Sequence, residues 1–190
     1  MSLENPHYQW YAIYTRANDE KKLFNNLRAK NIECFLPTRK VRKDWIDRNK
    51  WSEEPMFRSY LFVRVSYREF FQALNTPGVI CFVSSGGKAQ AIPEVQINNI
   101  KTFLAQSDHE VSISYEHVNK GRLVEISTGS LQGIHGEIVN INEQPRLLTR
   151  LDSLKCCLYT VLTEKEAFVL EEKPVYKETV FLKSYAYLNN

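Results

Sequence analysis

The stretch SYLFVRV, residues 59–65, constrains the fold more than any other part of the chain, because its side chains alternate in character. Successive residues of a strand point to opposite faces of a sheet. Leu61 and the two valines that follow it form one aliphatic row, typical of a face that packs against helices. Tyr60 and Phe62 fall on the other row, where polar side chains would be expected. The segment therefore predicts a strand with an aliphatic face and an aromatic face.

Composition indicates an ordinary globular protein. The chain has 190 residues, of which 43% are hydrophobic and 25% are charged, enough for one large or two small domains. No apolar run is long enough to span a bilayer, and the N-terminus lacks the basic and apolar segments of a secretion signal. We therefore expect a cytoplasmic protein that acts as a monomer without membrane contact.

Cysteine spacing and charge distribution narrow the chemistry. The four cysteines show no spacing typical of a zinc site, so we expect reduced, mostly buried thiols, no metal and no cofactor. The net charge is only +3, but six basic and two acidic residues fall between Arg39 and Lys50. Positive charge is thus concentrated in one loop-like segment, close to Trp45 and Trp51.

Strand signals occur four times in the first half of the chain. Besides SYLFVRV, the segments 8–15, 32–40 and 79–83 are rich in aromatic and branched residues. Pro37 interrupts or edges the second of these strands, because proline cannot donate to a neighbouring strand.

Helix signals fall between these strands. Apolar residues at helical spacing predict a helix over about 19–30, with Asn18 as its N-cap. Ser66 and Glu69 form the S-x-x-E pattern of a capping box, and Pro93 suits the start of a third helix. The order is β-α-β-β-α-β with an added helix. It predicts an α+β domain with a ferredoxin-like, split βαβ antiparallel sheet and helices on one face.

The second half of the chain changes character. Four of the seven glycines lie between Gly121 and Gly136. The short alternating runs LVEI, EIVNI, LYTVL and AFVL, separated by turn residues, predict a small all-β barrel. We divide the chain into a first domain over 1–107, a linker over 108–118, a barrel over 119–172 and a tail over 173–190.

Ordered motifs in both halves carry a family resemblance. WYAIYT, FLPTRK, EPMFRSYLFVRV and TPGVICFV follow one another, and NKGRLVEISTGSLQGIHGEIVNI comes later. Over about residues 8–172 the chain resembles the NusG family of transcription elongation factors, in its branch of specialised antiterminators (UpxY/RfaH-like). The resemblance implies a NusG N-terminal-like (NGN) domain and an SH3-like KOW barrel. Gly121, Gly129 and Gly136 would stand at turns of that barrel.

The resemblance also implies a function without catalysis. Members of this branch bind the clamp helices of RNA polymerase and suppress pausing or termination, often at long polysaccharide-type operons. The family's polymerase-binding surface is an aromatic patch on the first sheet, which maps here to Tyr14, Tyr60, Phe62 and Phe82. Strand alternation agrees, because it places these residues on the face of the sheet opposite the aliphatic rows. A second interpretation stays open, in which the chain itself covers these rings.

Nucleic acid is a second candidate partner. Cations of the basic segment are suited to phosphate contacts while a nearby tryptophan stacks on a base, but a solvated hairpin braced by tryptophan is an equal alternative. Arg16 matches a family position that contacts non-template DNA. The next residue is Ala17 rather than a second cation, which argues against the same sequence-specific readout; nascent RNA is another candidate. The candidate residues in the basic segment are Arg39, Lys40, Arg42 and Lys43.

The predicted barrel suggests further partners and no enzyme. KOW relatives imply a ribosomal protein or a termination factor as partner, and the alternative function is a KOW-containing RNA-binding or ribosome-associated protein. Cys/His chemistry would need Cys156 or Cys157 beside His135. Adjacent residues of a strand point to opposite faces, so we expect one cysteine in the core and one at the surface. No glycine-rich phosphate loop is recognisable.

Overall fold

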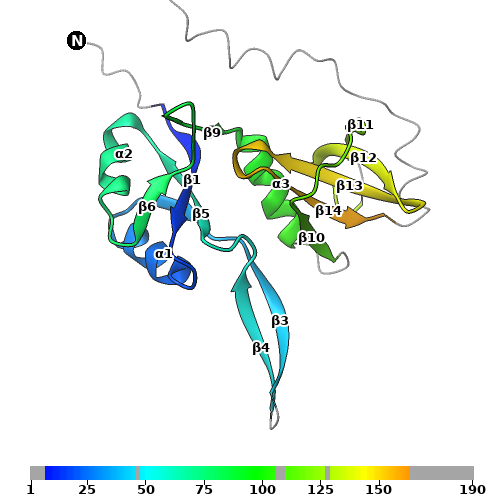
Figure 1. Ribbon diagram of the computed structural model, residues 1–190, viewed down its shortest axis with the longest axis horizontal. Helices are drawn as coiled ribbons and strands as arrows, with labels where there is room; N and C mark the ends of the chain where they lie inside the picture. Colours follow the sequence, from blue (N-terminus) through cyan, green and yellow to red (C-terminus); the bar gives the residue numbers. More distant parts are fainter. Residues whose placement is uncertain (1–6, 46–47, 106–109, 127–128, 163–190) are drawn as a thin grey trace, which may run out of the picture.

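The described residues form two five-stranded antiparallel β-sheets with a helix between them (Figure 1). The computed structural model describes residues 7–45, 48–105, 110–126 and 129–162, with the backbone alone for 42–45 and 48–50. Within these ranges, no helix is both long and apolar enough to cross a membrane.

The first sheet has the strand order β2-β5-β1-β6, and the short β9 also pairs with β1. All of these pairs are antiparallel. The order and directions confirm the predicted α+β, split βαβ arrangement. The strands are β1 (Gln9–Thr15), β2 (Glu33–Phe35), β5 (Tyr60–Val65), β6 (Val79–Phe82) and β9 (Ala91–Ile92).

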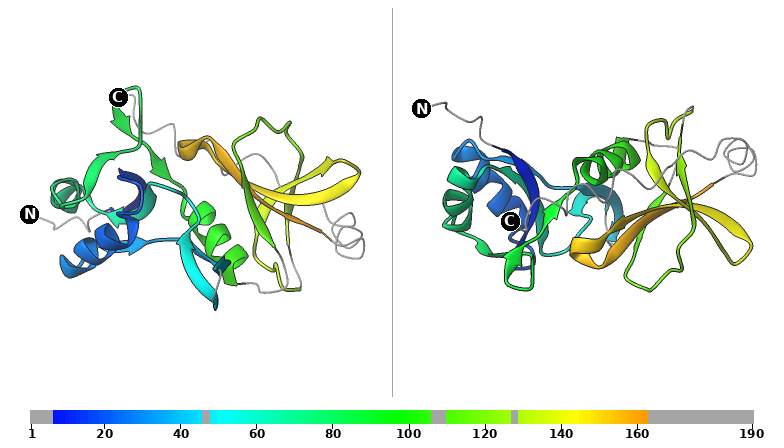
Figure 2. Two further views of the ribbon diagram at one scale, coloured as in Figure 1. Left: turned by 60° about the horizontal axis from the view of Figure 1, so that its bottom comes forward. Right: turned by 90° about the horizontal axis from the view of Figure 1, so that it is seen from above.

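Two helices, α1 (Glu20–Ala29) and α2 (Tyr67–Leu74), cover one face of the first sheet (Figure 2). Leu61 and the two valines of β5 are buried in one cluster with Leu23 and Leu27 of α1. Burying a side chain of this size stabilises the fold by about 1.5–3 kcal/mol. The aliphatic row of SYLFVRV is therefore core, as its alternation predicts.

Hydrogen bonds fix the starts of both helices. The backbone N–H and the hydroxyl of Ser66 both donate to Glu69 Oε2, at 3.0 and 2.9 Å, which confirms the predicted capping box. The prediction of Asn18 as N-cap of α1 is wrong: Asn18 has a φ of 70° in the turn before the helix, a conformation that asparagine tolerates. Buried Glu20 instead accepts a hydrogen bond from the Ser59 backbone N–H at 2.8 Å, tying α1 to the turn before β5.

A third helix, α3 (Glu94–Ala105), lies on the opposite face of the first sheet (Figure 2). Its buried Ile100 and Phe103 belong to one continuous hydrophobic cluster with Phe62 of the first sheet and Leu147 of the second. The two sheets therefore share a core through α3.

The second sheet is also antiparallel, in the order β10-β14-β13-β12-β11. β10 lies inside the segment 108–118, which we expected to be a linker, yet it is an edge strand; the domain boundaries themselves stay a prediction. β13 has no counterpart among the predicted strands, because Pro145 and two arginines interrupt its alternation. The predicted run AFVL, 167–170, and the tail lie outside the described residues. The strands are β10 (Val111–Ser114), β11 (Arg122–Glu125), β12 (His135–Ile141), β13 (Gln144–Leu151) and β14 (Cys156–Val161).

The glycines of the second sheet serve two purposes. Gly129 lies in a turn with φ +83°, as predicted. Gly136 lies inside β12 instead, where a Cβ would come within 2.6 Å of the Leu148 carbonyl oxygen, and a Cβ on Gly121 would overlap the Ile138 carbonyl. These two glycines therefore allow close backbone approach rather than a turn.

The basic segment forms a β-hairpin rather than a loop. β3 (Thr38–Trp45) and β4 (Arg48–Pro55) pair along their whole length, and Pro37 separates β3 from β2 as predicted. The hairpin projects away from both sheets (Figure 1). Lys21 Nζ of α1 donates to the Glu53 backbone carbonyl at 2.7 Å, which holds the base of the hairpin. A much shorter hairpin joins β7 (Ser84–Ser85) to β8 (Lys88–Ala89).

Candidate interaction surface on the first sheet

Five aromatic side chains lie on the face of the first sheet that turns away from α1 and α2. Tyr14 is the register partner of Tyr60, and Phe62 that of Phe35. Ring centroids lie 5.4 Å apart in the first pair and 6.2 Å apart in the second. The predicted common face of Tyr14, Tyr60 and Phe62 is confirmed. We call this set the aromatic face; its members are Trp10, Tyr14, Phe35, Tyr60 and Phe62.

The helix α3 covers most of the aromatic face. Phe62 and Trp10 are buried in the cluster that contains Phe103 of α3. Lys101 of α3 places its Nζ 5.1 Å from the ring centroid of Trp10 and 5.6 Å from that of Phe35, within range of cation–π attraction. This part of the aromatic face is therefore core of the described structure.

Tyr14 and Tyr60 form the edge of the aromatic face that reaches solvent, and we call this pair the tyrosine rim. Tyr14 is 38% exposed and Tyr60 is partly buried. Burial raises the pKa of Tyr60, and the neighbouring Tyr14, Cys81 and Cys156 raise it further. Burial, Cys156 and Tyr60 likewise raise the pKa of Tyr115. Because Cys156 and Tyr115 come from the second half of the chain, the tyrosine rim lies where the two sheets meet.

Phe82 lies on the other face of the first sheet, so its predicted place beside Tyr60 is wrong. It is 6% exposed and belongs to the cluster beneath α1 and α2. Its ring stacks on Phe70 of α2, with 4.1 Å between ring centroids. Phe82 therefore holds α2 against the sheet.

An irregularity in strand pairing explains this difference. Thr15 of β1 pairs with Val79, but Tyr14 pairs with Cys81, so β6 has one extra residue at this point. An extra residue of this kind shifts the alternation of the bulged strand. Cys81 consequently takes the position beside Tyr14, and Ile80 is left exposed.

Asn99 holds α3 against the second sheet. Its side chain is 2% exposed. Nδ2 donates to the His135 backbone carbonyl and, at 3.2 Å, to Thr149 Oγ1, while Oδ1 accepts from the His135 backbone N–H at 3.1 Å. Both ends of the amide are thus satisfied, as buried polar groups require. Sequence reasoning missed this residue, although an asparagine beside Ile100 in an apolar helix was a signal.

The residues predicted to contact nucleic acid lie in two places, at the end of β1 and along β3. Exposed Arg16 directly follows β1, two residues after Tyr14. Exposed Arg39 and Lys40 lie at the base of the hairpin. The other two candidates, at positions 42 and 43, lie further along β3, where the backbone alone is described.

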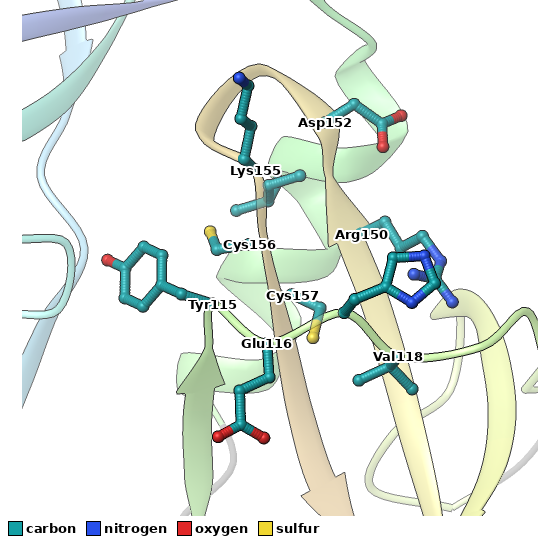
Figure 3. Close-up of a pocket in the computed structure, with 10 residues that line it drawn as sticks. Tyr115, Glu116, Val118, Arg150, Asp152, Lys155, Cys156 and Cys157 are labelled. Carbon is teal, nitrogen blue, oxygen red and sulfur yellow. The ribbon is translucent and has the colours of Figure 1, made fainter.

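A pocket of about 230 Å³ lies beside the short helix η1 (Asp152–Leu154) in the second half of the chain (Figure 3). The adjacent thiols of Cys156 and Cys157 line it. Both are buried, so the prediction that one lies at the surface is wrong: Cys156 packs in the shared core, and Cys157 packs with Val139 and Leu148 on the other side of the sheet.

The thiols of this pocket are poor nucleophiles. Burial, with Cys157 adding to it, raises the pKa of Cys156 to about 12, and burial also raises that of Cys157. A thiol in this state stays protonated near neutral pH and reacts slowly. His135 Nε2 lies 3.9 Å from Glu125 Oε1, across the β11–β12 pair. The raised pKa values of both thiols therefore argue against their use as nucleophiles.

Comparison with protein families relates the first half of the chain to transcription factors. The NusG family model, described as transcription termination factor nusG, matches residues 8–101. This range spans the first sheet, the basic hairpin and most of α3. Residues 8–101 are therefore similar to the NusG family. The similarity relates this part of the chain to a family described as transcription termination factors.

Two solved structures also match. One, described as "Domain interaction in Thermotoga maritima NusG", is 20% identical, with 84% of this chain and 96% of that chain covered and a TM-score of 0.47. The other, "Crystal Structure of MjSpt4:Spt5 complex conformation A", is 15% identical, with 73% and 83% covered and a TM-score of 0.27. No curated protein matches the chain.

Proposed function

We propose that the protein is an operon-specific elongation and antitermination factor that binds the clamp helices of RNA polymerase. The observation that carries the proposal is the NusG-family match over residues 8–101, the same part of the chain that bears the aromatic face. The factor suppresses pausing or termination, at long operons of the polysaccharide type. Support for the choice of operon comes from the motif resemblance to specialised relatives.

The tyrosine rim is the proposed contact with polymerase. Tyr14 and Tyr60 present adjacent rings where β1 ends and β5 begins. Tyrosine suits the centre of an interface, because it buries a large ring with few rotatable bonds and keeps a hydroxyl for hydrogen bonding. Phe62 supports the rim from within the core, whereas Phe82, on the helix-covered face, takes no part.

In the described state, the second sheet competes with polymerase for the tyrosine rim. Tyr60 packs against the cluster that includes Cys156 of β14. A partner that contacts the whole ring of Tyr60 must therefore bind a state in which the second sheet has moved away from it. The apparent affinity is reduced by the fraction of molecules in that open state.

The second sheet is the proposed KOW module, with a ribosomal protein or a termination factor as its partner. The motif NKGRLVEISTGSLQGIHGEIVNI supports this proposal, since it runs through β11 and β12.

Binding of core RNA polymerase tests the proposed surface. The double variant Tyr14→Ala/Tyr60→Ala should bind at least about tenfold more weakly than wild type, a loss of about 1.4 kcal/mol. The matched control is Tyr67→Ala/Phe71→Ala on α2, which removes two aromatic rings that are 85% and 58% exposed on the other side of the sheet. The control should bind as wild type does, and circular dichroism checks the fold of both.

Two results would refute this function. Either wild type fails to bind polymerase, or the two double variants lose affinity equally. A wild-type chain that binds RNA but not polymerase would favour the alternative, a KOW-containing RNA-binding or ribosome-associated protein.

A further inference from the structure

The second sheet carries apolar side chains on both of its faces. Leu147 and Leu158 lie on the face that packs in the shared core. Strand alternation places Leu148 and its register partner Tyr159 on the opposite side, which we call the outward face. An antiparallel sheet with one covered face usually has polar side chains on the other. The apolar residues of the outward face include Leu123, Val139, Leu148, Cys157, Tyr159 and Val161.

The described residues cover the centre of the outward face and leave its borders exposed. Leu148 is fully buried in the small cluster at the centre, and Val118 packs against that cluster. Leu123 on β11 and Val161 at the end of β14 are 44% and 43% exposed. The apolar surface therefore extends past the part that the described residues cover.

A cation on the outward face adds a polar requirement. Arg146 lies between Val139 and Val161 in the strand register. Its guanidinium carbon lies 4.8 Å from the ring centroid of Tyr159. Its Nε is buried and has no hydrogen-bond partner among the described residues, a state that costs stability until an acceptor is supplied. The outward face thus suits an occupant with apolar side chains and an oxygen acceptor.

The chain continues from the border of this face. Leu162 directly follows Val161, and its backbone N–H donates to the Pro145 carbonyl at 2.9 Å. Further along, VFLKSYAYL, residues 180–188, has seven apolar residues in nine. Residues 163–179 reach up to about 55 Å when extended. From β14 to β11 the sheet is about 14 Å wide, three strand spacings, so 180–188 can reach every part of the outward face.

The size of the exposed surface favours an occupant on the same chain. A stable interface between free partners buries about 800 Å² on each side, far more than two partly exposed aliphatic side chains and a half-buried tyrosine offer. A tethered segment needs less contact, because its effective concentration is about 1 mM and most of the entropy of association is already lost.

We propose that residues 180–188 dock on the outward face of the second sheet, over Leu123, Tyr159 and Val161. The segment covers the exposed borders of the apolar surface, and the tail supplies a carbonyl or carboxylate oxygen to Arg146. The inference goes beyond the proposed function, because neither the tyrosine rim nor polymerase takes part.

Hydrogen exchange of the full chain, measured by mass spectrometry, tests the proposal. In wild type the amides of 180–188 should exchange at least about tenfold more slowly than an unstructured chain, as expected for a Kd of about 0.1 mM at an effective concentration of about 1 mM. Leu123→Thr/Val161→Thr should bring them close to the unstructured rate. Each substitution places a hydroxyl in the contact, while threonine keeps the β propensity of the strands.

Two further variants locate the contact. Tyr67→Ala/Phe71→Ala is the matched control, because it removes two exposed rings of α2, a different apolar surface of the described residues. It should leave the exchange of 180–188 unchanged. Phe181→Ser/Leu182→Ser changes only the tail and should speed exchange at the borders of the outward face, in β11 and at the end of β14. Slow exchange of the central strand β13 in every variant shows that the sheet is intact.

Four outcomes would overturn the inference. They are unprotected amides of 180–188 in wild type, protection that survives Leu123→Thr/Val161→Thr, protection that is lost in the α2 variant, and protection that rises with protein concentration. The third would place the tail on α2, and the fourth would indicate a second copy of the chain. Leu123→Thr/Val161→Thr should still bind core polymerase through the tyrosine rim, so each proposal can fail without the other.

Discussion

Glu137 of β12 connects three segments in the second half of the chain. Its carboxylate accepts hydrogen bonds from Arg150 Nε and Nη2, at 2.7 and 2.9 Å, and from the Gly121 backbone N–H at 2.9 Å. Burial acts to raise the pKa of Glu137, but the hydrogen bonds from Arg150 and Gly121 outweigh it and lower the pKa below its ordinary value of 4.5. Folding therefore stabilises the charged carboxylate.

Replacing Glu137 with glutamine should lower the free energy of unfolding by about 1–2 kcal/mol near neutral pH. A depressed folded-state pKa contributes stability that is present above the unfolded value and is lost as the pH falls through the folded value. The difference between wild type and Glu137→Gln should therefore shrink in acid, below the ordinary value of 4.5. Urea unfolding at neutral and acidic pH measures it, and a difference that does not change with pH would contradict this account.

At the residue scale, strand parity correctly predicted the side-chain directions in regular strands. It failed where they depend on strand pairing or on packing against distant parts of the chain. Tyr60 and Phe62 share a face because β5 is regular. Phe82 does not follow, because one extra residue in β6 reverses its side, and nothing in TPGVICFV reveals the bulge. Cys156 and Cys157 are both buried because each face of the second sheet packs in a hydrophobic cluster, the shared core on one face and a smaller cluster on the other. Strand parity shows that the two side chains point to opposite faces, but not that both faces are covered.

At the scale of elements, α3 is distinguished by burying side chains toward both sheets. Phe103 and Ile100 lie in the shared cluster, and Asn99 bonds to the backbone of β12 and a side chain of β13. Hydrophobic contacts are non-directional, whereas the hydrogen bonds of a buried amide require a particular geometry. Asn99 therefore fixes how the second sheet sits on α3.

Changing Asn99 to alanine should weaken this docking by about 1–3 kcal/mol, because it leaves the backbone groups of His135 without their buried partner. Chemical unfolding measures the loss, and hydrogen exchange should show faster exchange of the amide groups of α3 and β12. Exposed Asn98, the preceding residue of the same helix, supplies the matched control Asn98→Ala. Equal stability of the two variants would show that the amide of Asn99 does not hold the sheet.

Elements with local signals could be predicted, and those set by distant contacts could not. The capping box of Ser66 and Glu69 and the strand break at Pro37 depend on neighbours in sequence, and both are confirmed. The central strand β13 lacks a clear alternation, since it lies between two partner strands and packs on both faces. The position of α3 depends on its packing against both sheets. Its own sequence therefore predicts that it is a helix, but not where the helix lies in the fold.

At the scale of the whole molecule, the two sheets form one structure with a continuous core. That core buries Phe62 and leaves the tyrosine rim partly accessible beside the second sheet. The sequence left open whether the aromatic rings are exposed or covered. In the structure the rings differ: α3 covers Trp10 and Phe62, whereas Tyr14 reaches solvent. We infer that movement of the second sheet controls access to Tyr60.

The affinity of core RNA polymerase for three chains tests this central claim most directly. The chains are wild type, Asn99→Ala, and Asn99→Ala combined with Tyr14→Ala and Tyr60→Ala. Loosening the second sheet raises the fraction in the open state, so Asn99→Ala should bind more tightly than wild type, and Asn98→Ala should not. The combined variant should lose that gain and bind more weakly than wild type. An Asn99→Ala chain that binds no more tightly than wild type, or a gain that survives removal of both tyrosines, would contradict the account.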